Sequence, residues 1–209
     1  GTATATYNNV IFNGGLYGAG WRGYTGTSTV NANGCTFNSR AGDYRTIAAM
    51  VRGKAENISL TFDDKCTFDS QYECYLGTDR DSEQKNPIPT SDNITITFKG
   101  TSTPIVKVSD GMQNVTVTGA KVNVAPFLWK ASTPNDLVKD FTIPSGKTWT
   151  FNDGLSMESG VKLTKNGTLK YGKSFDTNVA TADELKAAVA LGADVIKLAD
   201  ATYDLNSTV

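Results

Sequence analysis

The chain contains no histidine, so acid–base chemistry would have to come from carboxylates, lysine, arginine or tyrosine. Catalytic triads that depend on histidine and zinc sites with histidine ligands are therefore excluded. The adjacent carboxylates Asp63 and Asp64 could serve a glycosidase, which holds two carboxyl groups about 5–10 Å apart across the sugar. Arg45 and Arg52 could abstract a proton only with a strongly lowered pKa, and arginine almost never deprotonates in proteins.

These four residues also fit purely structural roles. Asp63 and Asp64 lie in TFDDKCTF, between two strand-like stretches, where aspartate is a common corner residue. Arg45 and Arg52 flank the apolar stretch TIAAMV and could simply mark its solvent-exposed ends. They are weak catalytic candidates, and we expect no catalytic constellation.

An acidic stretch, GTDRDSEQ, spaces Asp79, Asp81 and Glu83 two residues apart, as oxygen ligands of calcium often are. The stretch lacks the central glycine and the distal glutamate of an EF-hand loop. We expect a solvated acidic loop and no cofactor, with calcium at these three residues as the alternative.

Three aromatic residues, Tyr17, Trp21 and Tyr24, stand in the glycine-rich stretch GGLYGAGWRGYTGTS. Aromatic rings lose little conformational entropy when they stack, so such a loop suits a sugar face or a protein partner. The same rings could instead pack over the edge of the fold. They are the ligand-binding candidates of this sequence.

Composition excludes several classes of partner. The chain of 209 residues has 20 basic and 21 acidic residues, and no lysine- or arginine-rich run that would hold a nucleic acid. No apolar stretch approaches the roughly 20 residues that span a bilayer, so we expect no membrane insertion. Cys35, Cys66 and Cys74 form no CxxC pair, and we expect buried thiols.

Short phrases recur along the first part of the chain. GCTFNS at 34–39 returns as KCTFDS at 65–70, and NISLTF at 57–62 returns as NITITF at 93–98 and NVTVTG at 114–119. Each phrase alternates apolar and polar residues between turn residues, as a short strand does. Repeats of this kind predict a β-solenoid; a β-sandwich would also give short alternating strands but no reason for repeated phrases.

A solenoid stacks each phrase on its successor, so that like residues form ladders. We therefore predict that Cys35 and Cys66 point inward, and that three apolar residues of one phrase lie above those of the next: Ile58 above Ile94, Leu60 above Ile96 and Phe62 above Phe98. Polar residues between them should point outward.

Changes in composition and residue pattern along the chain predict four parts. Solenoid coils occupy 1–125, a proline-containing connector 126–140, and short glycine-rich strands 141–175, which form further coils or a small meander. The part 176–209 holds a capping helix and the first strand of a further, truncated solenoid. The whole sequence starts at Gly1 rather than at methionine, which suggests an excised or processed segment of a longer protein.

One helix is predicted after residue 181. Thr181 and Glu184 form a capping box, and Gly192 gives the C-terminal stop. The predicted apolar stripe consists of Leu185, Ala188 and Val189.

The stretch TADELKAAVALGADVIKLADATYDL at 181–205 resembles the opening of right-handed parallel β-helix proteins of the pectate-lyase type. In that superfamily a helix covers the end of the coil and a GD-x-I-x-L-x-x-G-x-Y strand begins the first turn; here Ala193 separates Gly192 from Asp194, and Ala201 replaces the later glycine. The resemblance implies an all-β fold, a right-handed parallel β-helix with one short helix near the C-terminus. Similar proteins are bacterial surface proteins, bacteriophage structural proteins and polysaccharide lyases.

These observations together predict a non-enzymatic structural and adhesive segment of an extracellular bacterial surface protein or a virion protein. Its expected partners are glycans or neighbouring protein subunits, including copies of itself in a homo-oligomer. The alternative is a polysaccharide lyase or glycoside hydrolase acting on an acidic polysaccharide, because fold does not settle function.

Overall fold

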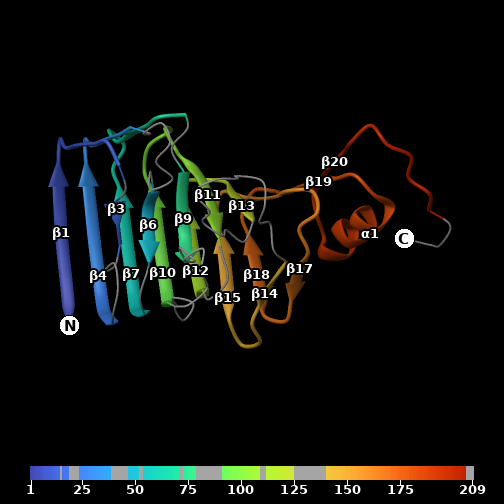
Figure 1. The fold of residues 1–209 in the computed structure, drawn as a ribbon, viewed down its shortest axis with the longest axis horizontal. Coiled ribbons are helices and arrows are strands. Elements are labelled where there is room, and N and C mark those ends of the chain that lie inside the picture. The colour runs from blue at the N-terminus through green and yellow to red at the C-terminus, as the bar shows by residue number, and fades with distance from the viewer. Residues whose placement is uncertain are drawn as a thin grey trace.

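The chain folds mainly into β-strands, with one short helix near its C-terminus. The computed structural model describes residues 1–14, 16–18, 24–38, 47–51, 54–70, 73–78, 91–108, 112–124 and 140–205. Strand pairs in this part of the chain are parallel, and the strands lie side by side along the long axis of the molecule (Figure 1). Parallel pairing contradicts the β-sandwich alternative, which needs antiparallel sheets.

Two long sheets dominate the architecture. The seven-stranded sheet runs, in spatial order, through β1 (Thr2–Asn8), β4 (Tyr24–Asn33), β7 (Lys54–Phe62), β10 (Ser91–Phe98), β12 (Met112–Thr118), β15 (Thr148–Phe151) and β18 (Thr168–Tyr171). The eight-stranded sheet runs through β3 (Leu16–Tyr17), β6 (Ile47–Val51), β9 (Glu73–Thr78), β11 (Ile105–Val108), β13 (Val122–Val124), β16 (Leu155–Met157), β19 (Phe175–Val179) and β20 (Val195–Leu198). Consecutive strands in the chain mostly alternate between sheets.

Two small sheets complete the fold. One contains β2 (Ile11–Phe12), β5 (Thr36–Phe37) and β8 (Thr67–Phe68), and the other contains β14 (Phe141–Ile143) and β17 (Leu163–Lys165). Because β15 pairs with β12 and β16 pairs with β13, the segment after residue 140 extends the same two long sheets. Its strands pair in parallel, unlike those of a meander.

The predicted stacking of the repeated phrases is confirmed. β7 and β10 pair with Ile58 opposite Ile94, Leu60 opposite Ile96 and Phe62 opposite Phe98, and all six side chains are buried. The polar residues between them are half-buried or exposed. Period-two alternation specifies this register because a slip by one residue would expose the whole apolar set.

Stacked rings and thiols fill the core between the sheets. The rings of Phe12 and Phe37 stack with centroids 4.9 Å apart, and those of Phe37 and Phe68 with centroids 4.8 Å apart. Cys35, Cys66 and Cys74 are buried, as predicted, and none of them forms a disulfide. Burial raises the pKa of Cys66 to about 11 and also raises that of Cys74, so neither is a ready nucleophile.

The predicted helix is present as α1 (Ala182–Leu191). The Thr181 side chain accepts a hydrogen bond from the Glu184 N–H, and Gly192 ends the helix in the left-handed conformation. The predicted apolar stripe was partly wrong, because Ala188 is buried but Val189 is 45% exposed. The helix turns Glu184, Ala187 and Leu191 toward the end of the sheets. Val189 follows Ala188 directly and therefore points about 100° away from it around the helix axis.

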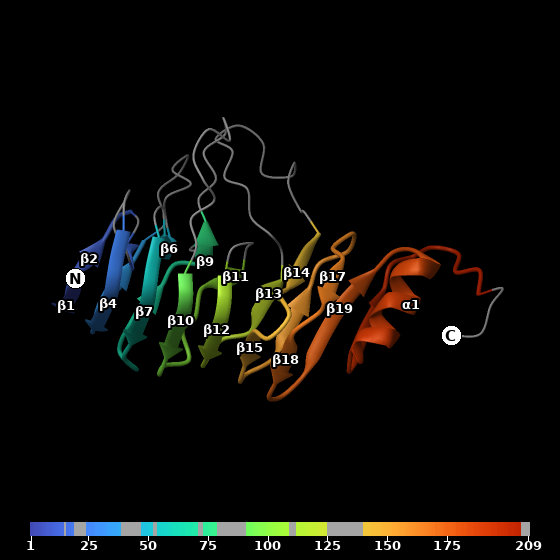
Figure 2. The same cartoon turned by 90° about the horizontal axis from the view of Figure 1, so that it is seen from below.

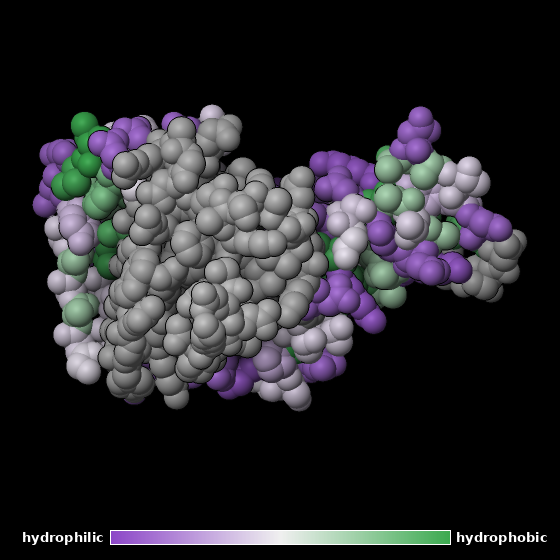
Figure 3. All heavy atoms as spheres, viewed as in Figure 1, coloured by the Kyte–Doolittle hydropathy of each residue, from purple (hydrophilic) through white to green (hydrophobic). Residues whose placement is uncertain are grey.

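β20 follows the helix and pairs in parallel with β19, so it extends the eight-stranded sheet. Around this end Val189, Val195, Leu198 and Leu205 are exposed. Figure 3 shows hydrophilic and hydrophobic residues intermixed over the described C-terminal part. Within the described residues, no helix has the length and apolar character needed to cross a membrane.

Candidate functional site

The carboxylate pair proposed for catalysis lies at a corner after β7. Asp63 Oδ1 accepts hydrogen bonds from the backbone N–H of Gly34, at 2.9 Å, and of Lys65, at 3.1 Å. The hydrogen bond from Gly34 holds the pKa of Asp63 below its usual range. A glycosidase acid needs the opposite shift, because it must be protonated near neutral pH. Asp64 beside it is exposed.

Asp63 instead joins neighbouring strands of the seven-stranded sheet. Gly34 directly follows β4 and Asp63 directly follows β7, and these two strands are paired. The carboxylate therefore satisfies a backbone donor of the neighbouring strand's turn, which is a structural role.

The same arrangement recurs at three other corners. After β15, Asp153 Oδ2 accepts a hydrogen bond from the N–H of Gly119, which follows the paired strand β12. Before β20, Asp194 Oδ2 accepts a hydrogen bond at 2.8 Å from the N–H of Phe175, the first residue of the paired strand β19. Asp140, directly before β14, likewise accepts a hydrogen bond at 3.0 Å from the N–H of Lys162, directly before the paired strand β17, so four aspartates of the described part of the chain hold one strand end to the next.

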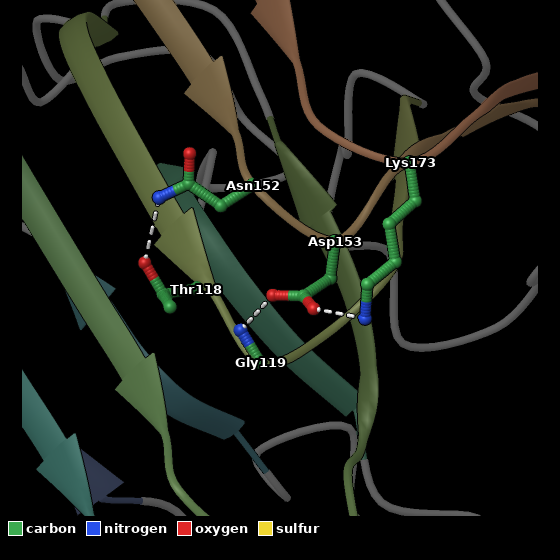
Figure 4. A network of polar contacts seen from close by, with 5 residues as sticks. All are labelled: Thr118, Gly119, Asn152, Asp153 and Lys173. Carbon is green, nitrogen blue, oxygen red and sulfur yellow. Dashed lines mark hydrogen bonds and ion pairs between the residues drawn. The ribbon is translucent and has the colours of Figure 1, made fainter.

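Figure 4 shows the corner at Asp153, where one carboxylate makes contacts in two directions. Its second oxygen pairs with Lys173 Nζ at 2.8 Å, and the neighbouring Asn152 side chain donates to Thr118 Oγ1 at 3.0 Å. The contact with Lys173 is the main reason that the pKa of Asp153 lies below its usual range. Such a carboxylate stays charged and fixed at neutral pH.

The structural roles of Asp153 and Asp194 were not predicted from the sequence, although a signal existed for Asp153. The phrase TFDD at 61–64 returns as TFND at 150–153, with TF as the last two residues of β7 and of β15, and Asp153 stands one place further from its strand than Asp63 does. The partner of each carboxylate is a backbone group 19–34 residues away, and only the strand register identifies it.

The other predicted site residues can be placed only in part. Arg45 and Arg52, the acidic residues Asp79, Asp81 and Glu83, and Trp21 lie outside the described residues. For Tyr17 and Tyr24 the backbone alone is described, at the end of β3 and the start of β4. No cluster of three potential metal ligands occurs within the described ranges.

A cavity of about 470 Å³ separates α1 from the ends of β16, β17 and β19. Aliphatic side chains line much of it, including Met157, Val161 and Leu191. Glu184 also lines it, but Glu184 Oε2 accepts hydrogen bonds from the Ala180 N–H at 2.8 Å and from Ser159 Oγ at 2.9 Å. That carboxylate fixes the start of the helix, and Glu158, Asp183 and Lys162 are the other charged residues that line the cavity.

The outward face of the seven-stranded sheet carries a regular set of uncharged polar side chains from β1 to β15, with the acidic residues Glu56 and Asp92 beside it on β7 and β10. Its side chains form three columns across the paired strands. The first column is Thr2, Thr27, Asn57, Asn93, Asn114 and Thr148; the second is Thr4, Thr29, Ser59, Thr95, Thr116 and Thr150; the third is Thr6, Asn31, Thr61, Thr97, Thr118 and Asn152. None of these side chains is buried. We call this surface the threonine–asparagine face.

Comparison with known proteins gave no relative: no family model, no curated protein and no solved structure matches this chain.

Proposed function

We propose that this chain is a right-handed parallel β-helix that acts as a rigid, non-enzymatic segment of an extracellular bacterial surface protein or a bacteriophage virion protein. The observation that carries the proposal is the use of its described aspartates. Asp63, Asp153 and Asp194 accept backbone hydrogen bonds between neighbouring strands, and the pKa of Asp63 and of Asp153 lies below the usual range. Carboxylates engaged in this way strengthen a stack of coils and are poor general acids.

Parallel sheets of seven and eight strands support the rigid role. Each strand pairs with its neighbours along the long axis, and buried apolar columns continue from one pair to the next. Repeat architectures of this kind present long side surfaces while each unit contacts only its neighbours.

The adhesive part of the proposal rests on the aromatic candidates. The chain passes from β3 in the eight-stranded sheet to β4 in the seven-stranded sheet between Tyr17 and Tyr24, and Trp21 lies between them in sequence. A glycan stacking on these rings is the contact that we propose. Neighbouring subunits are the second proposed partner, because the edge strands β1 and β18 can pair with another chain.

A panel of acidic and neutral polysaccharides tests this function, with and without calcium. We expect retention of the protein on at least one polymer and no release of reducing ends or unsaturated uronates. Trp21→Ala should weaken the retention, whereas the control Tyr171→Ala, at a partly exposed tyrosine of β18 near the opposite end, should leave it unchanged. Product formation that disappears in Arg52→Ala or Asp63→Ala would contradict the proposal and establish the lyase or hydrolase alternative.

A further inference from the structure

The threonine–asparagine face is unusual in containing no charged residue at any of its positions from β1 to β15. Charged residues make up 20% of the whole chain, and exposed strand positions are where they ordinarily gather. Lys170 on β18 is the first charged residue to enter the second column, opposite Thr150. The absence of charge is therefore a property of the three columns, whereas Glu56 and Asp92 lie directly beside the first column on β7 and β10.

The face also has a regular spacing in two directions. Along each strand the outward residues are every second residue, about 6.6 Å apart, and neighbouring strands lie about 4.8 Å apart. The pairing registers keep the columns straight across the strands. Figure 2 shows β4, β7, β10, β12, β15 and β18 side by side along one long side of the molecule. Hydroxyl, methyl and amide groups thus form a near-rectangular grid.

Side chains of this grid are held in place before any partner arrives. Threonine is stiff about its first side-chain torsion because it is β-branched. In the first column, Asn93 Nδ2 donates to Asn57 Oδ1 at 2.9 Å and Asn114 Nδ2 donates to Asn93 Oδ1 at 3.1 Å. Binding to a rigid face loses little conformational entropy.

The partner that fits this grid is a flat, uncharged and regularly repeating surface. Nucleic acids and charged proteins need complementary charge, and protein hot spots and sugar faces favour aromatic anchors, none of which the face carries. Ice is an uncharged lattice of hydrogen-bonding groups that repeats regularly in two directions, as the groups of the grid do. Threonine offers a methyl group that orders adjacent water and a hydroxyl group that bonds to it.

We propose that the threonine–asparagine face binds ice. The hydroxyl and amide groups of the three columns take positions of the ice lattice, and the methyl groups fill the spaces between them. This inference goes beyond the glycan and subunit contacts proposed above and does not depend on them.

Slow growth of ice from a dilute solution of the protein tests the inference directly, because ice rejects solutes that do not bind it. We expect the protein to enter the ice fraction and to inhibit recrystallisation. The double variant Thr95→Lys with Thr116→Lys places two charges in the centre of the grid, and it should lower the fraction in ice about tenfold or more, because the ammonium groups would lose their hydration. Thr67→Lys is the matched control, since Thr67 is exposed on the separate three-stranded sheet, and it should behave as the wild type.

A milder double variant, Thr95→Ser with Thr116→Ser, keeps the hydroxyl groups and removes two methyl groups, so it tests the grid without a risk to folding. We expect a smaller loss of ice incorporation at an unchanged circular dichroism spectrum. Exclusion of the wild-type protein from ice would overturn the inference, as would an equal loss in Thr67→Lys. Retention on crystalline chitin or cellulose, lost in the same lysine variant without any affinity for ice, would equally overturn it.

Discussion

At the residue scale, aspartate side chains stabilise the contacts between neighbouring strands of this molecule. Asp63, Asp153 and Asp194 each accept a backbone N–H from the turn or end of a neighbouring strand. A charged acceptor makes a shorter and stronger hydrogen bond than a neutral one. Asp176 on β19 is similar, because its ion pair with Lys121 is the main cause of its lowered pKa.

These contacts predict a stability that falls in acid. The folded pKa of Asp63, Asp153 and Asp176 is lowered from the ordinary value, so their contribution is complete above the unfolded pKa of about 3.9. It is lost as the pH falls from about 4 through the folded pKa values. We expect Tm to drop steeply below about pH 4.

Asp153→Asn tests one of these contacts, because it removes the charge that pairs with Lys173 and keeps an oxygen acceptor. After allowance for the exposure of Lys173, the loss should be about 1 kcal/mol at pH 7, or a fall in Tm of about 2–4 °C for a chain of this size. The difference from wild type should shrink as the pH falls from about 4 through the lowered pKa of Asp153. Asp64→Asn, at the exposed neighbour of Asp63, is the control and should leave Tm nearly unchanged; equal effects at both positions would refute the structural role of Asp153.

At the element scale, the strands that repeat a phrase were predictable and the corners between them were not. NISLTF and NITITF carry the same apolar residues at the same places, and this match alone predicts the register of β7 on β10. The caps of α1 were equally local, since Thr181 and Gly192 act within one turn. The middle part of the three columns, on β7, β10 and β12, follows from the same repeated phrases. The aspartate corners depend on the unequal lengths of chain between strands, and local patterns do not encode those lengths.

Two glycines with the same backbone conformation test how closely neighbouring strands approach. Gly119 and Gly146 both have positive φ, +83° and +75°. A Cβ at Gly119 would collide with the carbonyl oxygen of Phe98 on the paired strand β10, whereas nothing lies within 4 Å of one at Gly146.

Gly146→Ala should therefore cost only the strain of the left-handed conformation, about 1–2 kcal/mol. Gly119→Ala should cost about 2 kcal/mol more, because the backbone of β10 or of the turn must also move. Urea denaturation of both variants measures the difference. Equal free energies of unfolding would mean that the turn after β12 is not packed against β10.

At the scale of the whole molecule, parallel pairing joins seven strands from β1 to β18 in one long sheet and eight strands from β3 to β20 in the other. Proposed roles in rigidity, adhesion and ice binding all need this continuity, because each uses a surface built from residues far apart in the sequence. In the second column of the threonine–asparagine face, Thr4 and Thr150 are separated by four intervening strands of the sheet, or five steps between strands. At about 4.8 Å per step their Cα atoms should lie about 24 Å apart.

Pulsed electron paramagnetic resonance on nitroxides at Thr4→Cys and Thr150→Cys is the most direct measurement of this stack. The native thiols Cys35, Cys66 and Cys74 are buried, so labelling of the folded protein should favour the two new positions. A narrow distribution near 24 Å, allowing for the length of the labels, is the predicted result. A broad distribution, or one centred well beyond 35 Å, would mean that the strands do not stack in this order and would contradict the continuous parallel architecture.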